Sequence, residues 1–215
     1  MTLRNRAMAT LASVAVFVVL FVLAVRAYPG GTDWDRATVG HQFWANYLCD
    51  LTRGVALNGA ANPLGSLLAQ AGTIVLALGL FPLWWLLPHF FPSRFWLGMA
   101  VRFFGSIGAA GAIAVTLLPS DRFGSLHTVA IVLAGPPGLL AALLAVAGLT
   151  LEKRAPRILA AIGGAMLATG AVDFVLYVTH LEGNAPVIVA VLERVTAILL
   201  VGWMATASLR ALRIT

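Results

Sequence analysis

The chain has 215 residues, of which 60% are hydrophobic and only 10% are charged. A soluble domain is typically about 45–50% apolar and about 25% charged, so this chain has too few charged side chains to cover a water-facing surface. Disorder needs the opposite composition, with few apolar residues and many charges. Both classes are excluded, and the composition predicts an integral membrane protein.

The net charge of +6 comes mainly from basic residues at the ends of apolar runs. Topology signals and lipid headgroup contacts are expected at such positions. The sequence has no basic stripe with interleaved aromatic residues, so we expect membrane lipids as partners and no nucleic acid. It identifies no protein partner. The single cysteine, Cys49, excludes an internal disulfide and a cysteine-rich metal site.

The first apolar run is longer than the hydrophobic region of a signal peptide. Residues 8–25 form a stretch of 18 residues without a charge, against about 7–15 in a signal peptide. Arg26 also interrupts the small-residue pattern of a cleavage site. We therefore expect a retained transmembrane helix.

Six apolar runs approach or exceed the about 20 residues that a helix needs to cross the hydrocarbon layer. The sequence lacks the alternating segments that form membrane barrels. The predicted fold is therefore all-α, a single transmembrane domain over residues 1–215 with a long, structured outer loop at 28–63. The predicted helices lie at about 8–27, 64–87, 96–118, 128–150, 158–179 and 187–209.

The distribution of Lys and Arg predicts the orientation of these helices. With both termini in the cytoplasm, nine of these basic residues lie inside and four lie outside. Short cytoplasmic loops carry an excess of Lys and Arg, so both termini are predicted to be cytoplasmic.

Two segments carry local structural signals. Residues 39–51 present roughly one aromatic or apolar side chain per helical turn, which predicts an interfacial helix on the outer leaflet with Asp50 facing the bundle. The fourth predicted helix contains Gly-Pro-Pro-Gly at 135–138, and two prolines remove two backbone donors, so we expect a break or kink there. Such breaks line substrate sites in transporters, but in most membrane proteins they are repaired by neighbouring helices.

Several short stretches resemble a known family. They are Tyr-Pro-Gly-Gly at 28–31, Phe-Trp-Ala-Asn-Tyr-Leu-Cys-Asp-Leu at 43–51, Asn-Gly at 58–59, Asn-Pro at 62–63, and Leu-Pro-Ser-Asp-Arg at 118–122 followed by His127. They are similar to uncharacterised bacterial six-helix membrane proteins grouped around the domain of unknown function numbered 998. The resemblance implies a six-helix fold in a bacterial inner membrane, and it implies no activity.

Charged groups inside a bilayer are costly and need a partner or a purpose. With the predicted topology, most of the unusual polar residues collect near the outer side. Asp173, Tyr177 and His180 are spaced i, i+4, i+7 and share one helix face. We therefore expect an outward-facing polar pocket that binds a lipid or another amphiphile. The expected pocket residues are Asp50, Arg53, Arg122, Tyr177, Glu193 and Arg194.

One ion pair is expected within the membrane. The last two predicted helices are antiparallel neighbours, and Asp173 and Arg194 lie at similar depths on them. Glu193 is the rival partner, but adjacent helical residues point about 100° apart. The sequence therefore predicts that Asp173 pairs with Arg194.

The alternative function is a membrane-embedded hydrolase or transferase acting on lipid. Its candidate catalytic residues are Asp121, His127, Asp173 and His180. A zinc site would use His41, His127 and His180, as in membrane-embedded zinc amide hydrolases that act on ceramide-like lipids. These histidines come from three separate segments without a His-x-x-x-His pair, so we expect no metal and no cofactor. A small transporter is a weaker alternative.

Overall fold

The computed structural model describes residues 1–180 and 185–214. Within these residues, six helices are long and apolar enough to cross a membrane, which confirms the predicted all-α fold. These helices are α1 (Leu3–Ala27), α2 (Pro63–Leu86), α3 (Phe95–Leu117), α5 (Ser125–Leu151), α6 (Arg157–Thr179) and α7 (Ile188–Leu212). The shorter elements are the 3-10 helices η1 (Cys49–Thr52) and η2 (Leu87–Phe90) and the single turn α4 (Ser120–Phe123).

Helix ends follow local sequence signals. Thr2 precedes α1, and its hydroxyl accepts a hydrogen bond from the Asn5 N–H at 3.2 Å, which satisfies one of the free donors of the first turn. Helix α2 begins at Pro63, a residue with no N–H to leave unsatisfied. Gly124 separates α4 from α5 with a φ of +48°, a conformation that favours glycine.

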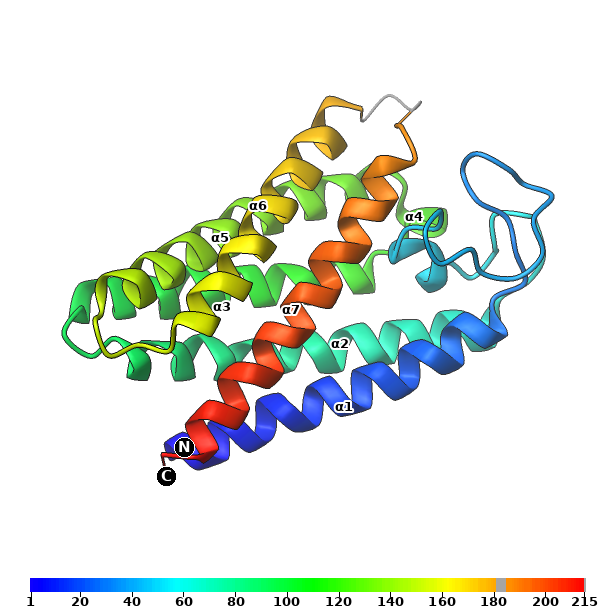
Figure 1. Ribbon diagram of the computed structural model, residues 1–215. Helices are drawn as coiled ribbons and strands as arrows, with labels where there is room; N and C mark the ends of the chain where they lie inside the picture. The colour runs from blue at the N-terminus through cyan, green and yellow to red at the C-terminus, as the bar shows by residue number, and fades with distance from the viewer. Residues whose placement is uncertain (181–184, 215) are drawn as a thin grey trace.

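The six long helices form a closed ring. Each packs against its two neighbours in the order α1, α2, α3, α5, α6, α7 and back to α1. Successive helices run antiparallel, so both chain termini lie at one end of the bundle (Figure 1). Residues 28–62, which join α1 to α2, lie at the opposite end (Figure 1). We call these the termini end and the loop end.

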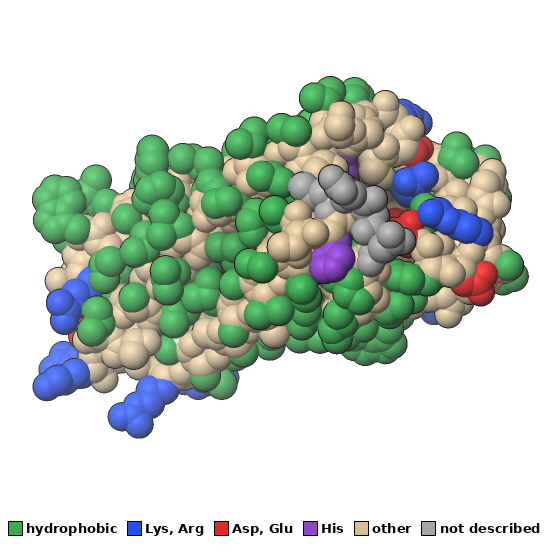
Figure 2. Space-filling model, turned by 90° about the horizontal axis from the view of Figure 1, so that it is seen from above, with side chains coloured by type: hydrophobic (Ala, Val, Ile, Leu, Met, Phe, Trp, Pro, Cys, Tyr) green, Lys and Arg blue, Asp and Glu red, His purple; other side chains and the backbone are tan. Residues whose placement is uncertain are grey.

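The outer surface of the bundle is apolar along its length. Val19 of α1, Leu67 of α2 and Leu133 of α5 are 59%, 66% and 69% exposed. Figure 2 shows hydrophobic side chains over the middle of one face and charged side chains gathered toward its two ends. Hydrocarbon chains offer no hydrogen bonds, so a surface of this kind suits a bilayer. The chain is thus a multi-pass membrane protein with a lipid-facing exterior.

Two tryptophans are buried inside the ring. The Trp84 and Trp203 rings meet edge to face with centroids 6.0 Å apart, a favoured aromatic geometry. The Trp203 indole N–H donates to the Leu159 carbonyl at 2.9 Å, so this polar group is satisfied. A Cβ at Gly105 would lie 2.3 Å from the Trp84 ring, so only glycine lets α3 approach at this height.

Helix α5 is continuous through its two prolines, so of the predicted break or kink the break is wrong. It runs unbroken from Ser125 to Leu151 with Pro136 and Pro137 inside it. Proline fixes φ near −65°, which is close to the helical value, so the backbone can stay helical at these residues even though two donors are lost. The flanking Gly138 leaves room for α3, because a Cβ at Gly108 would lie 2.9 Å from the Gly138 backbone.

The predicted interfacial helix over residues 39–51 is also wrong. This stretch contains turns and the short η1 helix, with isolated bridges from Gly30 to Val39 and from Val55 to Ala61 on either side. Side chains of the loop capture its backbone N–H groups: the Asn46 Oδ1 accepts from the Gln42 N–H at 2.9 Å. Asn and Asp compete with helix formation in this way. The loop is therefore structured, but by side chain to backbone bonds.

Candidate functional site

A cavity of about 430 Å³ lies inside the ring. Its walls come from α2, α3, α5, α6 and α7, and the loop contributes Tyr47, Leu48, Cys49 and Thr52 at the loop end. The close approach of α3 and α5 at Gly108 and Gly138, both of which line the cavity, positions two of its walls.

The cavity wall is mostly apolar, and its ionisable side chains lie toward the loop end. Near the loop end it is lined by the polar side chains of Tyr47, Cys49, Thr52, Thr116, His127, Asp173, Tyr177 and Glu193. Its deeper wall is formed by side chains that include Leu80, Trp84, Ala109, Ala142, Met166 and Leu200. The lining is therefore amphipathic along the bundle axis.

His127 lines this cavity, and one of its ring nitrogens has no hydrogen-bond partner among the described residues. Its side chain is only 4% exposed, and its Nδ1 lies 2.7 Å from the Leu118 carbonyl. A carbonyl can only accept, so Nδ1 carries the hydrogen and Nε2 of the neutral ring keeps a lone pair. This Nε2 is buried with no hydrogen-bond partner among the described residues. A buried polar atom without a partner calls for an explanation, and a donor on a ligand supplies one.

Two carboxyl groups line the cavity from neighbouring helices. Asp173 of α6 makes no hydrogen bond or ion pair within residues 1–180 and 185–214. Glu193 of α7 accepts a hydrogen bond from the Leu48 N–H of the loop at 2.8 Å. One carboxyl group is thus fixed by the loop, and the other is left for whatever occupies the cavity.

Arg194 does not pair with Asp173, so the predicted ion pair is wrong. Its Nε donates to the Phe43 carbonyl at 3.1 Å and its Nη2 to the Asn46 carbonyl at 2.9 Å. The guanidinium lies over the Phe21 and Phe43 rings, 5.3 and 4.9 Å from their centroids. Among the described residues, the only ion pair joins Arg36 to Asp33.

The physical reason is the angle between adjacent helical residues. Glu193 and Arg194 point about 100° apart on α7, and Glu193 takes the side that faces the cavity. Arg194 therefore faces α1 and the loop, where two backbone carbonyls and two aromatic rings replace the solvation of its charge.

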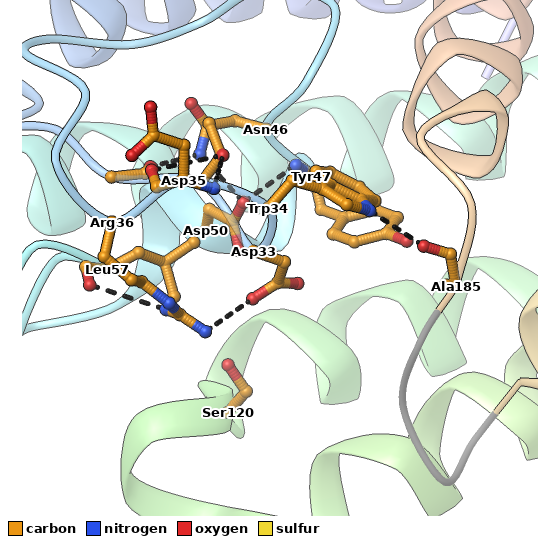
Figure 3. A network of polar contacts seen from close by, with 12 residues as sticks. Asp33, Trp34, Asp35, Arg36, Asn46, Tyr47, Asp50, Leu57, Ser120 and Ala185 are labelled. Carbon is orange, nitrogen blue, oxygen red and sulfur yellow. Dashed lines mark hydrogen bonds and ion pairs between the residues drawn. The ribbon is translucent and has the colours of Figure 1, made fainter.

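The loop segment that holds Arg194 is itself organised around Asp50. The Asp50 carboxylate accepts from the Asn46 amide at 3.0 Å and from the Tyr47 N–H at 2.8 Å. Figure 3 shows this group beside the Trp34 side chain, whose indole N–H donates to the Ala185 carbonyl at 2.9 Å just before α7. Burial is the main cause that raises the pKa of Asp50 to about 6. Asp50 thus shapes the loop against α7 and does not line the cavity.

His41 lies in a cage of aromatic rings at the end of α1. Its ring contacts those of Phe21, Tyr28 and Phe43 with centroids 5.9–6.5 Å apart. Neither of its ring nitrogens has a partner in the described part of the chain. Burial, with a smaller contribution from the charge of Arg194, lowers the pKa of His41 to about 4, so the ring is neutral at pH 7.

Asp121 fastens the loop to α4. Its Oδ2 accepts from the Gly54 and Val55 N–H groups at 2.8 and 3.1 Å. Beside it, the Arg53 guanidinium donates to the Ser120 hydroxyl at 3.2 Å. Arg122 also lies next to Gly54. These side chains hold the loop over the bundle, and none of them lines the cavity.

The three candidate zinc ligands lie apart. His127 lines the cavity, His41 sits in its aromatic cage, and the Nδ1 of His180 bonds the Leu176 carbonyl at 2.8 Å at the end of α6. Over the described ranges, no group of three His, Cys, Asp or Glu side chains is close enough to hold a metal ion.

The structure thus brings four predicted site residues to one cavity. They are His127, Asp173, Tyr177 and Glu193. The cavity is also lined by Cys49 and Trp84, which are not among the predicted site residues. Nothing in the sequence marks these two positions, because neither cysteine nor tryptophan is unusual in a membrane protein.

Comparison of the chain with protein-family models, curated proteins and solved structures finds no match. The resemblance to the family of unknown function 998 therefore stays a prediction.

Proposed function

We propose that this protein binds an amphiphile in its intramembrane cavity, with the ligand's polar group at the loop end and its apolar part at the bundle centre. The observation that carries the proposal is the amphipathic lining of this one cavity. Its volume of about 430 Å³ is within the roughly 300–1,000 Å³ of small-molecule sites. Ionisable groups within a membrane protein are a functional-site hypothesis by default.

The chemistry of the lining favours a ligand that donates hydrogen bonds. Asp173 and Glu193 are acceptors when ionised, and the unpartnered Nε2 of His127 is an acceptor when its ring is neutral. An amine or hydroxyl headgroup complements these atoms, whereas a carboxylate headgroup meets like charge. We therefore expect a single-chain amine or alcohol to bind better than the fatty acid of the same length.

The test uses dodecylamine, dodecanol and dodecanoate with the purified protein at fixed detergent concentration. A Cβ at Gly138 meets no atom within 4 Å, and Gly138 lines the cavity, so Gly138→Leu fills the site without a close clash at the backbone. A Cβ at Gly164 is equally unobstructed but lies outside the cavity lining, so Gly164→Leu is the matched control. Cys49 is the only thiol and lines the cavity. Burial raises the pKa of this thiol, so alkylation is measured at alkaline pH, where its rate reports occupancy.

Dodecylamine and dodecanol should slow Cys49 alkylation in a saturable way in the wild type and in Gly164→Leu. Gly138→Leu should lose this protection, and dodecanoate should protect less. Equal protection in all three proteins would show that the amphiphiles act through the micelle, and the proposal would then be abandoned.

A lipid hydrolase or transferase is the second candidate, favoured by the free lone pair of His127 in the same cavity as Asp173. A neutral imidazole so placed is suited to act as a general base. His180 is not part of this arrangement. A His127→Gln variant that still binds dodecylamine but has lost a lipid-cleaving activity of the wild type would favour the enzyme, and absence of turnover in the wild type would exclude it. The continuous α5 gives no support to the transporter alternative.

The proposal places the loop end outside a bacterial inner membrane, with both termini in the cytoplasm. Nine of the basic residues then lie on the cytoplasmic side, as the positive-inside rule expects. Val39 is 87% exposed at the loop end, so a Val39→Cys probe in a Cys49→Ser background should react with an impermeant maleimide on intact cells. Arg213→Cys in the same background should react only after the membrane is opened, and the reverse pattern would invert the orientation.

A further inference from the structure

A second hollow, of about 200 Å³, lies at the termini end of the bundle. It is formed where α2 continues through η2 and turns into α3, far along the bundle from the amphiphile cavity. His89 of η2, Arg94 before α3 and Arg102 of α3 line it. None of the described residues around it carries a carboxyl group. We call it the basic hollow.

The arginines of the basic hollow are not neutralised within the part of the chain that the structure describes. Neither Arg94 nor Arg102 forms an ion pair within 4.0 Å. The Arg102 Nε is buried without a hydrogen-bond partner, although its guanidinium lies 5.1 Å from the centroid of the Trp85 ring. Glu152 is close enough to Arg94 for the two charges to interact, but it does not form an ion pair with Arg94 and accepts a hydrogen bond from the Ser93 hydroxyl at 2.5 Å.

Neighbouring groups add positive charge and hydrogen-bonding capacity to the basic hollow. The Arg6 guanidinium lies beside the same tryptophan as Arg102: it donates to the Trp85 carbonyl at 3.1 Å and lies 5.6 Å from the centroid of the Trp85 ring. Arginine forks match phosphate oxygens in geometry and charge. The His89 Nδ1 lies 3.2 Å from the Leu86 carbonyl, which leaves its Nε2 free to donate when the ring is protonated.

Exposed aromatic side chains surround the hollow at the same height. Phe95, which lines it, is 62% exposed, the adjacent Trp96 is 79% exposed, and Trp85 is 44% exposed. Aromatic side chains gather at the headgroup level of a bilayer. Basic pockets between helix ends at this depth suit the phosphates of anionic lipids.

We infer that the basic hollow binds a phosphate group, which is supplied either by the headgroup of an anionic phospholipid or by free phosphate. Arg94 and Arg102 hold the phosphate oxygens, and the surrounding aromatic side chains keep the site at the membrane interface. The inference concerns the opposite end of the bundle from the amphiphile cavity and does not depend on the proposed function.

The test measures phospholipid retention by native mass spectrometry, with delipidated protein titrated with phosphatidylglycerol or phosphatidylcholine. The wild type should retain one phosphatidylglycerol in preference to phosphatidylcholine. Arg94→Gln/Arg102→Gln should weaken phosphatidylglycerol binding at least about tenfold, because two charge-assisted contacts are lost. The matched control, Arg154→Gln/Arg213→Gln, removes the same charge from basic residues outside the hollow and should bind as the wild type does.

Two further arms make each outcome decisive. Arg94→Lys/Arg102→Lys keeps the charge but loses the fork geometry, so it should bind more tightly than the glutamine variant and less tightly than the wild type, which covers the case in which the glutamine variant does not fold. Millimolar inorganic phosphate should displace phosphatidylglycerol if free phosphate is the natural source, and should leave it bound if the lipid is. A wild type without preference for phosphatidylglycerol, or equal losses in both glutamine double variants, would overturn the inference.

Discussion

Replacing Arg194 tests how the loop is held on the bundle. Arg194 is 1% exposed, and its guanidinium makes two charge-assisted hydrogen bonds to the carbonyls of Phe43 and Asn46. Each such bond contributes about 1.5–3 kcal/mol, so Arg194→Gln, which loses both and strands two carbonyls, should cost about 3 kcal/mol or more. In a chain of this size, about 3 kcal/mol lowers Tm by about 6–12 °C, which thermal unfolding in detergent resolves.

The same variant separates the observed contacts from the ion pair that the sequence suggested. Asp173 has no bond to Arg194, so the Tm changes of Asp173→Asn and Arg194→Gln should simply add in the double variant. Arg36→Gln is the control, because its pair with Asp33 joins side chains that are 56% and 44% exposed, and such a pair contributes about 0–1 kcal/mol. A double variant whose Tm change is smaller than the sum of the two single changes would refute the reasoning.

Two further predictions concern helix packing and pH. Gly108→Ala should lower Tm measurably more than Gly164→Ala, because its Cβ would lie 2.9 Å from the Gly138 backbone whereas that at Gly164 meets nothing within 4 Å; equal shifts would contradict the close approach. The buried, neutral His41 has a pKa of about 4, below its ordinary value of 6.5, so the unfolded chain binds a proton more readily and stability should fall as pH drops from about 6.5 to 4. Between pH 6.5 and 4, the Tm of His41→Phe should therefore fall less than that of the wild type. A difference in Tm between the two proteins that stays constant over this range would contradict the prediction.

The loop shows where sequence periodicity misleads. Aromatic and apolar residues at helical spacing over residues 39–51 favoured an interfacial helix, yet the backbone forms turns and a short 3-10 helix. Asn46 and Asp50 bond backbone N–H groups of the loop at 2.8–2.9 Å, and so replace the bonds that a helix would have used. A sequence shows which residue types can compete with helical hydrogen bonds, but it does not show which bonds form. Here the outcome also depends on Arg194 of α7, which donates hydrogen bonds to two backbone carbonyls of the same segment.

Composition by itself determined the six membrane helices of this protein. A bilayer offers no hydrogen bonds, so each apolar run must satisfy its own backbone, and only a helix does that within one segment. Depth also follows from the sequence, since rise per residue is fixed, and it placed Asp173 and Glu193 near the same end. The direction in which a side chain points around its helix axis does not follow from the sequence in this way. Whether a side chain meets the cavity, a loop or lipid depends on how six helices rotate against one another, and that is set by packing of side chains that are nearly all apolar and carry no distinguishing pattern. Tertiary structure alone therefore decided that Glu193 faces the cavity while Arg194 faces the loop.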